Sequence, residues 1–399
     1  PGGGNVKRLR ALWLALCLLC GCGRFTPQAT LPPGATGDPP PTCPPRPEAA
    51  EQLTWLHGFY AISSYEQLSL ADKLDAVSLG WARMCFDAQR GPWVNTTSEG
   101  GNGWVTPKGS ETVLEALEEK GVGYPLSVFT SQDNKTVLPD GTQTNVLVTV
   151  ISEEYRDAAI DTLVAAAERY SGLTVDFEGL ASGQYREVFS DFMSLLRERL
   201  PADKTLYVAV PPDTWYQGYD YRALGEICDK VILMAHDYQW QSVPVDAIGT
   251  VNTYTPLTPL PRVEEALWSI TDPVTGVADA SKVALAISFA TVGVEVEEEA
   301  DLLKGDRLYN PGVQPLARRL VQEDAEICWD EGSASSYVFY HDEEGRRYKV
   351  WYESPESVAA KIEAALACGV SGLSLWRLGA VPEFEHYNVW SVILEKAER

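Results

Sequence analysis

The sequence predicts an α/β fold of the (β/α)8 type, a closed TIM barrel of parallel strands. From residue 51 onward, short apolar runs alternate with amphipathic segments, and eight of these runs have the length of a buried strand. The chain has 399 residues, and one such barrel can take up ~250 or more of them. An open doubly wound sheet is the alternative, but no G-x-G-x-x-G motif follows a strand, so dinucleotide binding has no support.

Each predicted strand is a short apolar run, and amphipathic segments of helical spacing lie between the runs. The eight predicted strands are Leu56–Ile62, Ala76–Met84, Tyr124–Phe129, Leu173–Phe177, Thr205–Val210, Lys230–Met234, Val283–Ser288 and Gly372–Trp376. The clearest predicted helices are Ser110–Lys120, Glu153–Tyr170, Tyr185–Leu200 and Ser357–Cys368.

An insertion of about residues 291–352 interrupts this alternation before the last helix and strand. The β-like runs Ser336–Tyr340 and Arg347–Tyr352 flank a polar turn that ends in Gly345, so a small β-hairpin is predicted there. Residues 291–330 are mostly polar, and we expect them to wrap around the rim of the barrel.

The first 50 residues are not predicted to belong to the barrel. A positive segment at residues 7–10 precedes an apolar run, Ala11–Gly21, that is too short to span a bilayer, which is typical of a secretory signal peptide over residues 1–22. Residues 23–50 contain nine prolines and few large apolar residues, so we expect an extended tether before a barrel at 51–399.

The end of the signal peptide resembles the lipobox of bacterial lipoproteins. The residues are Leu19-Cys20-Gly21-Cys22, and the resemblance implies that Cys22 is lipidated after cleavage. The protein is then expected at the extracellular face of the bacterial cytoplasmic membrane, held only by its lipid anchor. Ordinary signal cleavage without a lipid is the alternative.

Composition excludes several classes of partner. A formal net charge of −24 argues against binding of nucleic acid or anionic lipid through a basic surface. The last four cysteines, Cys85, Cys228, Cys328 and Cys368, are widely scattered and form no C-x-x-C pair, so no metal site is predicted, and no cofactor motif is present. Twelve Trp and 18 Tyr suggest stacking on sugars, although most large aromatic residues belong to a core. We expect a monomer.

The most informative segment is residues 171–178, Ser-Gly-Leu-Thr-Val-Asp-Phe-Glu. Side chains alternate between the two faces of a strand, so Asp176 and Glu178 share a face with Thr174. In a barrel this face points inward, and the two carboxylates lie at the carboxyl end, where barrel active sites are found. The alternative is a pair at the rim that is bridged to Arg or Lys.

This segment resembles the D-x-x-D-x-D-x-E signature of family 18 glycoside hydrolases. Asp176 and Glu178 match the last two acidic positions, whereas Ser171 and Thr174 replace the first two. Residues 234–237, Met-Ala-His-Asp, resemble the family's M-x-Y-D, with His236 in place of Tyr, and Trp376 resembles the Trp that ends the last strand. The segments around Trp376 look most like the spore-cortex and cell-wall branch, and the resemblance covers roughly 51–390.

The resemblance implies substrate-assisted, retaining hydrolysis of a glycan that contains N-acetylglucosamine. Glu178 is then the general acid and Asp176 orients the acetamido group, which His236 and Asp237 hold in place, while Trp376 stacks under the sugar. Met234 is a further candidate substrate contact. Aromatic residues near strand ends are candidate sugar platforms: Tyr60, Trp104, Trp215, Tyr238 and Trp240.

Peptidoglycan or cortex fragments are the favoured substrates, because the predicted anchor places the protein between membrane and wall. An endoglycosidase for chitin or N-glycans is the enzymatic alternative. A carbohydrate-binding barrel without catalytic activity is the other alternative, although such a protein is expected to lose Glu178.

Overall fold

The computed structural model describes residues 45–238, 242–298 and 300–399. The predicted signal peptide, Cys22, most of the tether and Trp240 lie outside these residues and stay predictions. Within the described part, no helix combines the length and the apolarity that crossing a bilayer requires. The last tether residues already contact the barrel, since Ala50 N donates to Leu366 O at 2.8 Å. Packing against the barrel therefore starts a few residues before the predicted boundary at residue 51.

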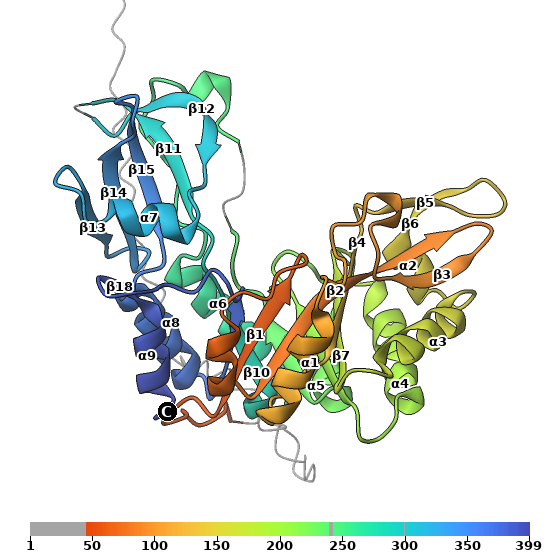
Figure 1. The fold of residues 1–399 in the computed structure, drawn as a ribbon. Coiled ribbons are helices and arrows are strands. Elements are labelled where there is room, and N and C mark those ends of the chain that lie inside the picture. Colours follow the sequence, from red (N-terminus) through yellow and green to blue (C-terminus); the bar gives the residue numbers. More distant parts are fainter. Residues whose placement is uncertain (1–44, 239–241, 299) are drawn as a thin grey trace, which may run out of the picture. The chain divides into compact units, whose positions relative to one another are not determined.

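Eight parallel strands form a closed barrel, which confirms the predicted fold class (Figure 1). The strands, in chain order, are β1 (Trp55–Ala61), β2 (Ala76–Asp87), β4 (Leu126–Ser131), β7 (Gly172–Glu178), β8 (Thr205–Val210), β9 (Lys230–Leu233), β10 (Val283–Ser288) and β16 (Gly372–Trp376). Each strand pairs with the next, and β1 pairs with both β16 and β2, which closes the ring. All eight correspond to predicted strands, with ends that differ by at most three residues.

Helices surround the barrel and cover the outward side chains of its strands. They are α1 (Ser110–Glu119), α2 (Val146–Ile151), α3 (Arg156–Ala167), α4 (Tyr185–Arg199), α5 (Tyr221–Ile227), α6 (Leu260–Ile270), α8 (Pro355–Ala367) and α9 (Val389–Lys396). On β7 the outward residues Leu173, Val175 and Phe177 are fully buried, and Phe177 packs against Phe189 and Phe192 of α4. This layer is the main hydrophobic core.

Short elements decorate the loops of the barrel. They are the strands β3 (Gly91–Asn95), β5 (Lys135–Val137), β6 (Gln143–Asn145), β17 (Glu383–Phe384) and β18 (Tyr387–Asn388), and the 3-10 turns Leu68–Lys73, Glu99–Gly101, Val245–Ala247 and Ala280–Lys282. β3 pairs antiparallel with the long strand β2 and extends the sheet beyond the ring.

The insertion between β10 and α8 is larger than the predicted hairpin. It is a five-stranded antiparallel sheet in the order β12-β11-β15-β14-β13, accompanied by α7 (Val313–Arg319) (Figure 1). Its strands are β11 (Val292–Val296), β12 (Leu303–Tyr309), β13 (Glu326–Asp330), β14 (Ser335–His341) and β15 (Arg347–Tyr352). The predicted hairpin is β14–β15, but the prediction that residues 291–330 wrap around the rim is wrong, because three of the strands come from this segment.

Strand alternation explains why this polar segment enters a sheet. Val292, Val294 and Val296 alternate along β11 and are all buried, in two small clusters that also contain Tyr254 and Leu257 from the segment between β9 and α6. A strand that buries only one face needs apolar residues only at every second position. The segment is therefore polar on average although β11 has an apolar face.

A buried ion pair lies where the insertion returns to the barrel. Lys361 Nζ on α8 lies 2.8 Å from Glu353 Oε2, and both residues are buried. Ser357 Oγ also donates to Glu353 Oε2, at 2.6 Å, so the carboxylate has two partners inside the protein. Breaking such a pair from one side leaves a buried charge without compensation.

We expect Lys361→Met to lower the free energy of unfolding by about 3–5 kcal/mol, because the Glu353 carboxylate stays buried without its cation. Urea unfolding at pH 7 measures this loss. Replacing both residues, with Glu353→Leu and Lys361→Met, removes the unpaired charge and should recover most of the stability.

The matched control is Lys396→Met. Lys396 Nζ lies 2.7 Å from Glu363 Oε1, but the Glu363 side chain is 64% exposed, so the loss should stay within about 1 kcal/mol. Equal losses for the two single variants would contradict this account of the buried pair.

Candidate active site

Strand β7 directs two carboxyl groups into the mouth of the barrel. Thr174 and Asp176 point inward and are 0% and 2% exposed, whereas Glu178, the last residue of the strand, is only half-buried. The alternation predicted from the sequence therefore holds along the whole strand. No Lys or Arg of the described chain pairs with either carboxylate, so the alternative of a bridged rim pair is not supported by the geometry.

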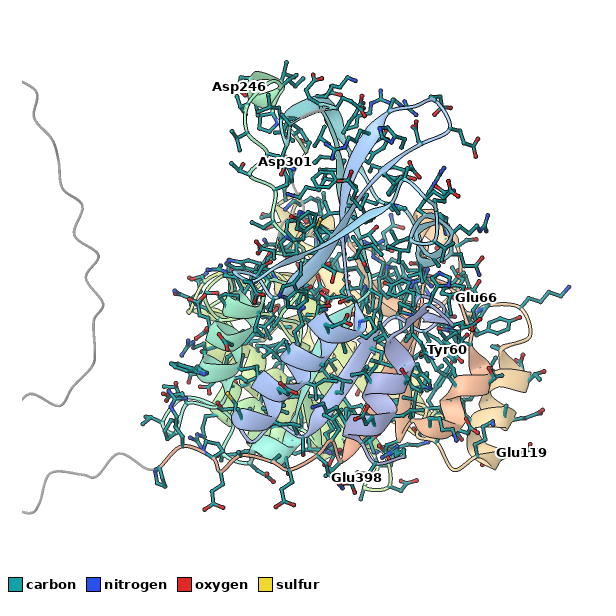
Figure 2. The ribbon with its side chains drawn as sticks, turned by 90° about the vertical axis from the view of Figure 1, so that its left-hand side faces the viewer. Tyr60, Glu66, Glu119, Asp246, Asp301 and Glu398 are labelled. Carbon is teal, nitrogen blue, oxygen red and sulfur yellow. The ribbon has the colours of Figure 1, made fainter. Side chains whose placement is uncertain are left out.

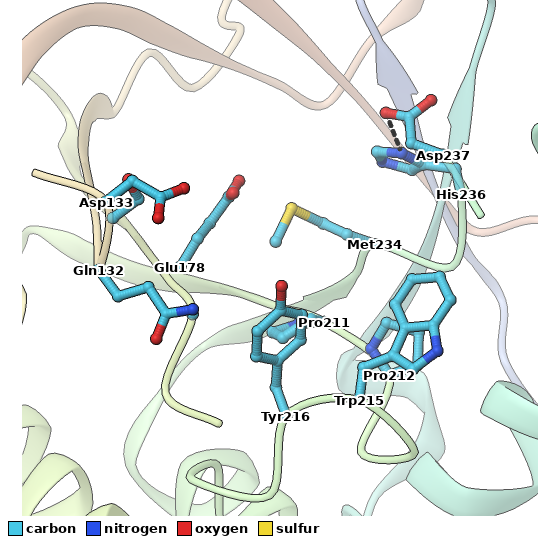
Figure 3. Close-up of a pocket in the computed structure, with 12 residues that line it drawn as sticks. Gln132, Asp133, Glu178, Pro211, Pro212, Trp215, Tyr216, Met234, His236 and Asp237 are labelled. Atoms are coloured by element: carbon cyan, nitrogen blue, oxygen red, sulfur yellow. Dashed lines mark hydrogen bonds and ion pairs between the residues drawn. The ribbon is translucent and has the colours of Figure 1, made fainter. Parts of the chain in front are cut away.

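A cavity of about 230 Å³ opens beside Glu178 (Figure 3). Its walls are formed by residues that end or follow β4, β7, β8 and β9, which are neighbours in the barrel. The lining residues are Ser131, Gln132, Asp133, Glu178, Gly179, Pro211, Pro212, Trp215, Tyr216, Met234, His236 and Asp237. Five residues predicted for the site therefore meet in one cavity.

Asp176 lies one inward position below Glu178 on the same strand and is almost completely enclosed. Its Oδ1 has no hydrogen-bond partner among the described residues. Burial, and secondly the neighbouring charge of Glu178, raise the pKa of the Asp176 carboxyl well above its usual value. Proton uptake or a donor from a bound molecule would relieve this unsatisfied carboxylate.

Glu178 also holds its proton more tightly than an exposed carboxyl group. Burial raises its pKa, the charge of Asp237 adds to this effect, and His236 opposes it. A carboxyl group that keeps a proton toward neutral pH is suited to general acid catalysis.

His236 and Asp237 form a pair on the other side of the cavity from Gln132 and Asp133, with Glu178 between the two groups (Figure 3). His236 Nδ1 lies 3.0 Å from Asp237 Oδ2, and His236 Nε2 is buried without a partner among the described residues. Burial alone would raise the pKa of Asp237, but the charge of His236 and its hydrogen bond outweigh that effect and lower it.

The pair fixes which ring nitrogen carries a proton. An ionised Asp237 can only accept, so Nδ1 must donate to it. Nε2 is then the ring nitrogen that remains without a partner among the described residues, where a Tyr at position 236 would offer a hydroxyl donor.

Two of the predicted aromatic platforms form one unit. Trp215 lines the cavity and packs edge-on against Tyr238, with ring centroids 4.5 Å apart. Tyr238 lies behind Trp215, where its hydroxyl donates to Arg262 O at 3.1 Å. Trp215 can therefore contact a ligand directly, and Tyr238 supports it.

Tyr60 and Trp376 do not reach this cavity. Tyr60, labelled in Figure 2, lies on the outer face of β1 and is 0% exposed, because Trp55, His57 and Phe59 occupy the inward positions of that strand. The structure therefore removes Tyr60 from the candidate platforms. Trp376 points into the barrel mouth and lines a neighbouring cavity.

Trp376 belongs to an aromatic layer across the mouth of the barrel. Its ring lies 5.4 Å from Phe59 and 6.3 Å from Trp104, measured between centroids, and Trp104 stacks on Phe129 at 4.6 Å. The side-chain amide of Asn102 donates to Trp104 O at 2.8 Å and helps to hold the Trp104 loop in place. The layer offers Trp376 a fixed orientation for stacking.

Neutral polar groups occupy the barrel interior below Asp176. One of them is Thr174, which stands where the family signature has its second Asp. Thr174 Oγ1 lies 2.6 Å from Ser78 Oγ, and the His57 ring lies 2.8 Å from both Ser78 Oγ and Ser374 Oγ. Burial lowers the pKa of His57 to about 3, so its ring is neutral at physiological pH. Asp176 thus has no second carboxylate beneath it with which to share a proton.

Sequence reasoning missed Gln132, Asp133 and Tyr216. The first two follow β4 directly, and Tyr216 follows β8 in the same loop as Trp215, so their positions after predicted barrel strands were the available signal. Gly179 keeps Gln132 close to the strand: it has a φ of +102°, and a Cβ there would lie 2.6 Å from Gln132 Cγ.

We also searched the described residues for a set of metal ligands. Across the described residues, no group of three or more His, Cys, Asp or Glu side chains could hold a metal ion.

Comparison with known proteins places this site in a family context. The family model of Glycosyl hydrolases family 18 matches residues 137–380, more than half of the chain. The cortical fragment-lytic enzyme of Bacillus anthracis is 24% identical over 272 residues, which are 66% of this chain and 58% of that protein. The chain thus spans a little over half the length of this curated relative.

Solved structures share the fold at low identity. The spore cortex-lytic enzyme SleL of Bacillus cereus superposes with a TM-score of 0.64 at 16% identity, covering 88% of this chain and 75% of that chain. A chitinase from Chromobacterium violaceum superposes with a TM-score of 0.64 at 23% identity, covering 87% of this chain and 99% of that chain.

We expect Glu178→Gln to lower the pKa of Asp176, because the charge of Glu178 contributes to raising it. A ¹³C NMR titration of the aspartate carboxyl carbons measures the shift. The exposed Glu187→Gln on α4 serves as the control and should leave Asp176 unchanged. An unchanged or higher pKa of Asp176 in Glu178→Gln would show that the two carboxyl groups are not coupled.

Proposed function

Because the chain belongs to glycosyl hydrolases family 18, a family of glycosidases, we propose that it is a retaining glycosidase that cleaves β-linked N-acetylglucosamine glycans. One observation carries this proposal: Glu178, with its raised pKa, lies in a cavity between the buried Asp176 and the His236–Asp237 pair. The proposed reaction is substrate-assisted, which is an exception to the usual scheme with two catalytic carboxylates.

In the first step Glu178 acts as the general acid. It transfers its proton to the glycosidic oxygen while the bond between this oxygen and C1 breaks. The oxygen of the substrate's own 2-acetamido group attacks C1 and forms an oxazolinium ion. The leaving sugar departs with the proton from Glu178, so the charge of Glu178 becomes negative as positive charge develops on the ring.

Asp176 is suited to hold the acetamido group during this step. An ionised Asp176 accepts a hydrogen bond from the acetamido N–H and compensates the developing positive charge, which also gives its unpaired Oδ1 a partner. On the other side, His236 lines the cavity and its buried Nε2 has no partner among the described residues, so we assign it to the acetamido group, while Asp237 fixes the orientation of the ring.

In the second step Glu178 acts as the general base. It takes a proton from a water molecule, whose oxygen attacks C1 from the side that the leaving sugar vacated. The oxazolinium ring opens, the acetamido group is restored, and the product keeps the configuration of the substrate. Glu178 regains its proton, so the cycle closes.

Peptidoglycan or cortex fragments are the proposed substrate, acted on by an enzyme that is lipid-anchored at the outer face of the cytoplasmic membrane. The lipobox-like residues before Cys22 and the name of the Bacillus anthracis relative support this choice. A chitin or N-glycan endoglycosidase is the second candidate, and the structural similarity to a chitinase favours it. We propose a monomer that needs no cofactor.

We expect Glu178→Gln to lower kcat on purified peptidoglycan by a factor of about 10²–10⁴, because the amide cannot transfer a proton. Reducing ends released from peptidoglycan and from chitin oligomers by the full chain measure the activity. Wild-type kcat/KM should fall as the pH rises through the raised pKa of Glu178, since only the protonated acid is active.

The exposed Glu187→Gln variant controls for a general effect of removing one carboxylate and should keep full activity. Faster release from chitin oligomers than from peptidoglycan would favour the second candidate. Equal activity of wild type and Glu178→Gln, or no release by wild type from either glycan, would overturn the catalytic proposal.

A further inference from the structure

A second cavity of about 230 Å³ lies beside Trp376 and has a charge opposite to that of the first cavity. The end of β10, the segment before α7 and the residues after β16 enclose it, and Phe289, Asn310, Trp376 and Arg377 are among its lining residues. Arg377 is the only charged residue among the described residues that line it.

Arg377 has no acidic partner within the described chain. Its guanidinium donates one long hydrogen bond, from Nη1 to Ala61 O at 3.4 Å, and no carboxylate of the described residues lies within ion-pair distance. A guanidinium group has five N–H donors in a planar fork that matches a carboxylate, so most of its binding capacity is unused.

Arg377 also lines an adjoining cavity together with Glu66 and Glu383, but both carboxylates have other partners. Glu383 Oε1 accepts from Gln67 Nε2 at 3.0 Å, and Glu66 Oε2, on the residue labelled in Figure 2, accepts from Ser64 Oγ at 3.3 Å. They do not neutralise Arg377 by direct contact.

The cavity beside Glu178 has the reverse character. No Lys or Arg belongs to its described lining, which carries the carboxyl groups of Asp133, Glu178 and Asp237 (Figure 3). Asp133 is exposed, and both it and Glu178 raise the pKa of the Tyr216 phenol after the larger effect of burial, so their charges act in the same space. The charges of this lining disfavour an anionic group, whereas the guanidinium of Arg377 is not in an ion pair and is available to bind one.

The two cavities lie on opposite sides of the barrel mouth. β16 is four strands away from β7 in either direction around the ring of eight, so Trp376 and Glu178 lie on opposite sides of the mouth. A glycan with one sugar stacked on Trp376 and its scissile bond at Glu178 would place the preceding sugar, on the non-reducing side, beside Arg377.

We propose that the cavity beside Trp376 is a subsite for a sugar that carries a carboxylate, with Arg377 as the residue that binds this group. The inference rests on the proposed function and makes its substrate class more specific. In peptidoglycan the unit that precedes N-acetylglucosamine is N-acetylmuramic acid, whose lactyl group bears a carboxylate, whereas chitin is neutral. Arg377 therefore selects peptidoglycan strands with free lactyl groups on the non-reducing side of the cleaved bond.

Three p-nitrophenyl β-disaccharides test this selection because only their non-reducing sugar differs. The first carries N-acetylmuramic acid with a free carboxylate, the second carries the same sugar as its neutral lactyl carboxamide, and the third carries N-acetylglucosamine. We expect wild-type kcat/KM to be about five- to tenfold higher for the carboxylate than for the carboxamide, and this ratio to fall with added salt.

Variants of Arg377 identify the group responsible. In Arg377→Gln the ratio of carboxylate to carboxamide should fall to about one, and Arg377→Lys should retain part of it, since the charge remains but the fork is lost. The matched control is Arg169→Gln, which removes an exposed guanidinium that pairs with Glu111 instead of lining the cavity. It should keep the wild-type ratio of carboxylate to carboxamide. A wild-type ratio near one, or a ratio unchanged in Arg377→Gln, overturns the proposal.

Binding separates this proposal from the proposed catalysis. If none of the three compounds is cleaved, the catalytic proposal fails, but their affinities for the full-length Glu178→Gln protein, measured by calorimetry, still test Arg377. A carboxylate preference that Arg377→Gln abolishes supports the subsite on its own. Equal affinities for the carboxylate and the carboxamide overturn it. Binding of the N-acetylglucosamine compound alone, with no binding of the other two, also overturns it.

Discussion

The burial of two carboxyl groups on one strand of a closed barrel is the constraint on which the site depends. Strand alternation puts Leu173, Val175 and Phe177 into the outer core, so the intervening Asp176 must face the interior and Glu178 the mouth. Enclosure raises the pKa of both groups. The packing that stabilises the barrel therefore also raises the pKa of Glu178 and leaves Asp176 Oδ1 without a hydrogen-bond donor among the described residues.

Neighbouring residues determine which carboxyl groups of the site carry a negative charge. His236 keeps Asp237 ionised, and this charge in turn helps Glu178 to keep its proton. Below Asp176, Thr174 and the neutral His57 leave that carboxyl group without a titrating neighbour beneath it. In this site the pKa is therefore raised for Asp176 and Glu178 and lowered for Asp237.

The sequence sufficed for the barrel because each of its strands is an apolar run that is buried on both faces. It did not suffice for β12 and β13, whose exposed polar residues resemble a loop until their partners in the sheet are known. In the site, Glu178, His236 and Asp237 were found through motifs fixed to strand ends. Asp133 and Tyr216 belong to no recognisable motif. Tyr60 was wrongly predicted as a sugar platform because it lies near a strand end, although strand alternation points its side chain away from the barrel interior.

The proposed mechanism requires that the substrate's acetamido oxygen, and not a carboxylate of the protein, attacks C1. Aryl β-glycosides of N-acetylglucosamine with zero, one, two or three fluorine atoms on the acetyl group test it directly, because fluorine weakens this oxygen as a nucleophile. If the acetamido oxygen attacks C1, kcat/KM falls steeply with each added fluorine. A rate that is independent of fluorine content would contradict it and would point to attack by Asp176 or by water.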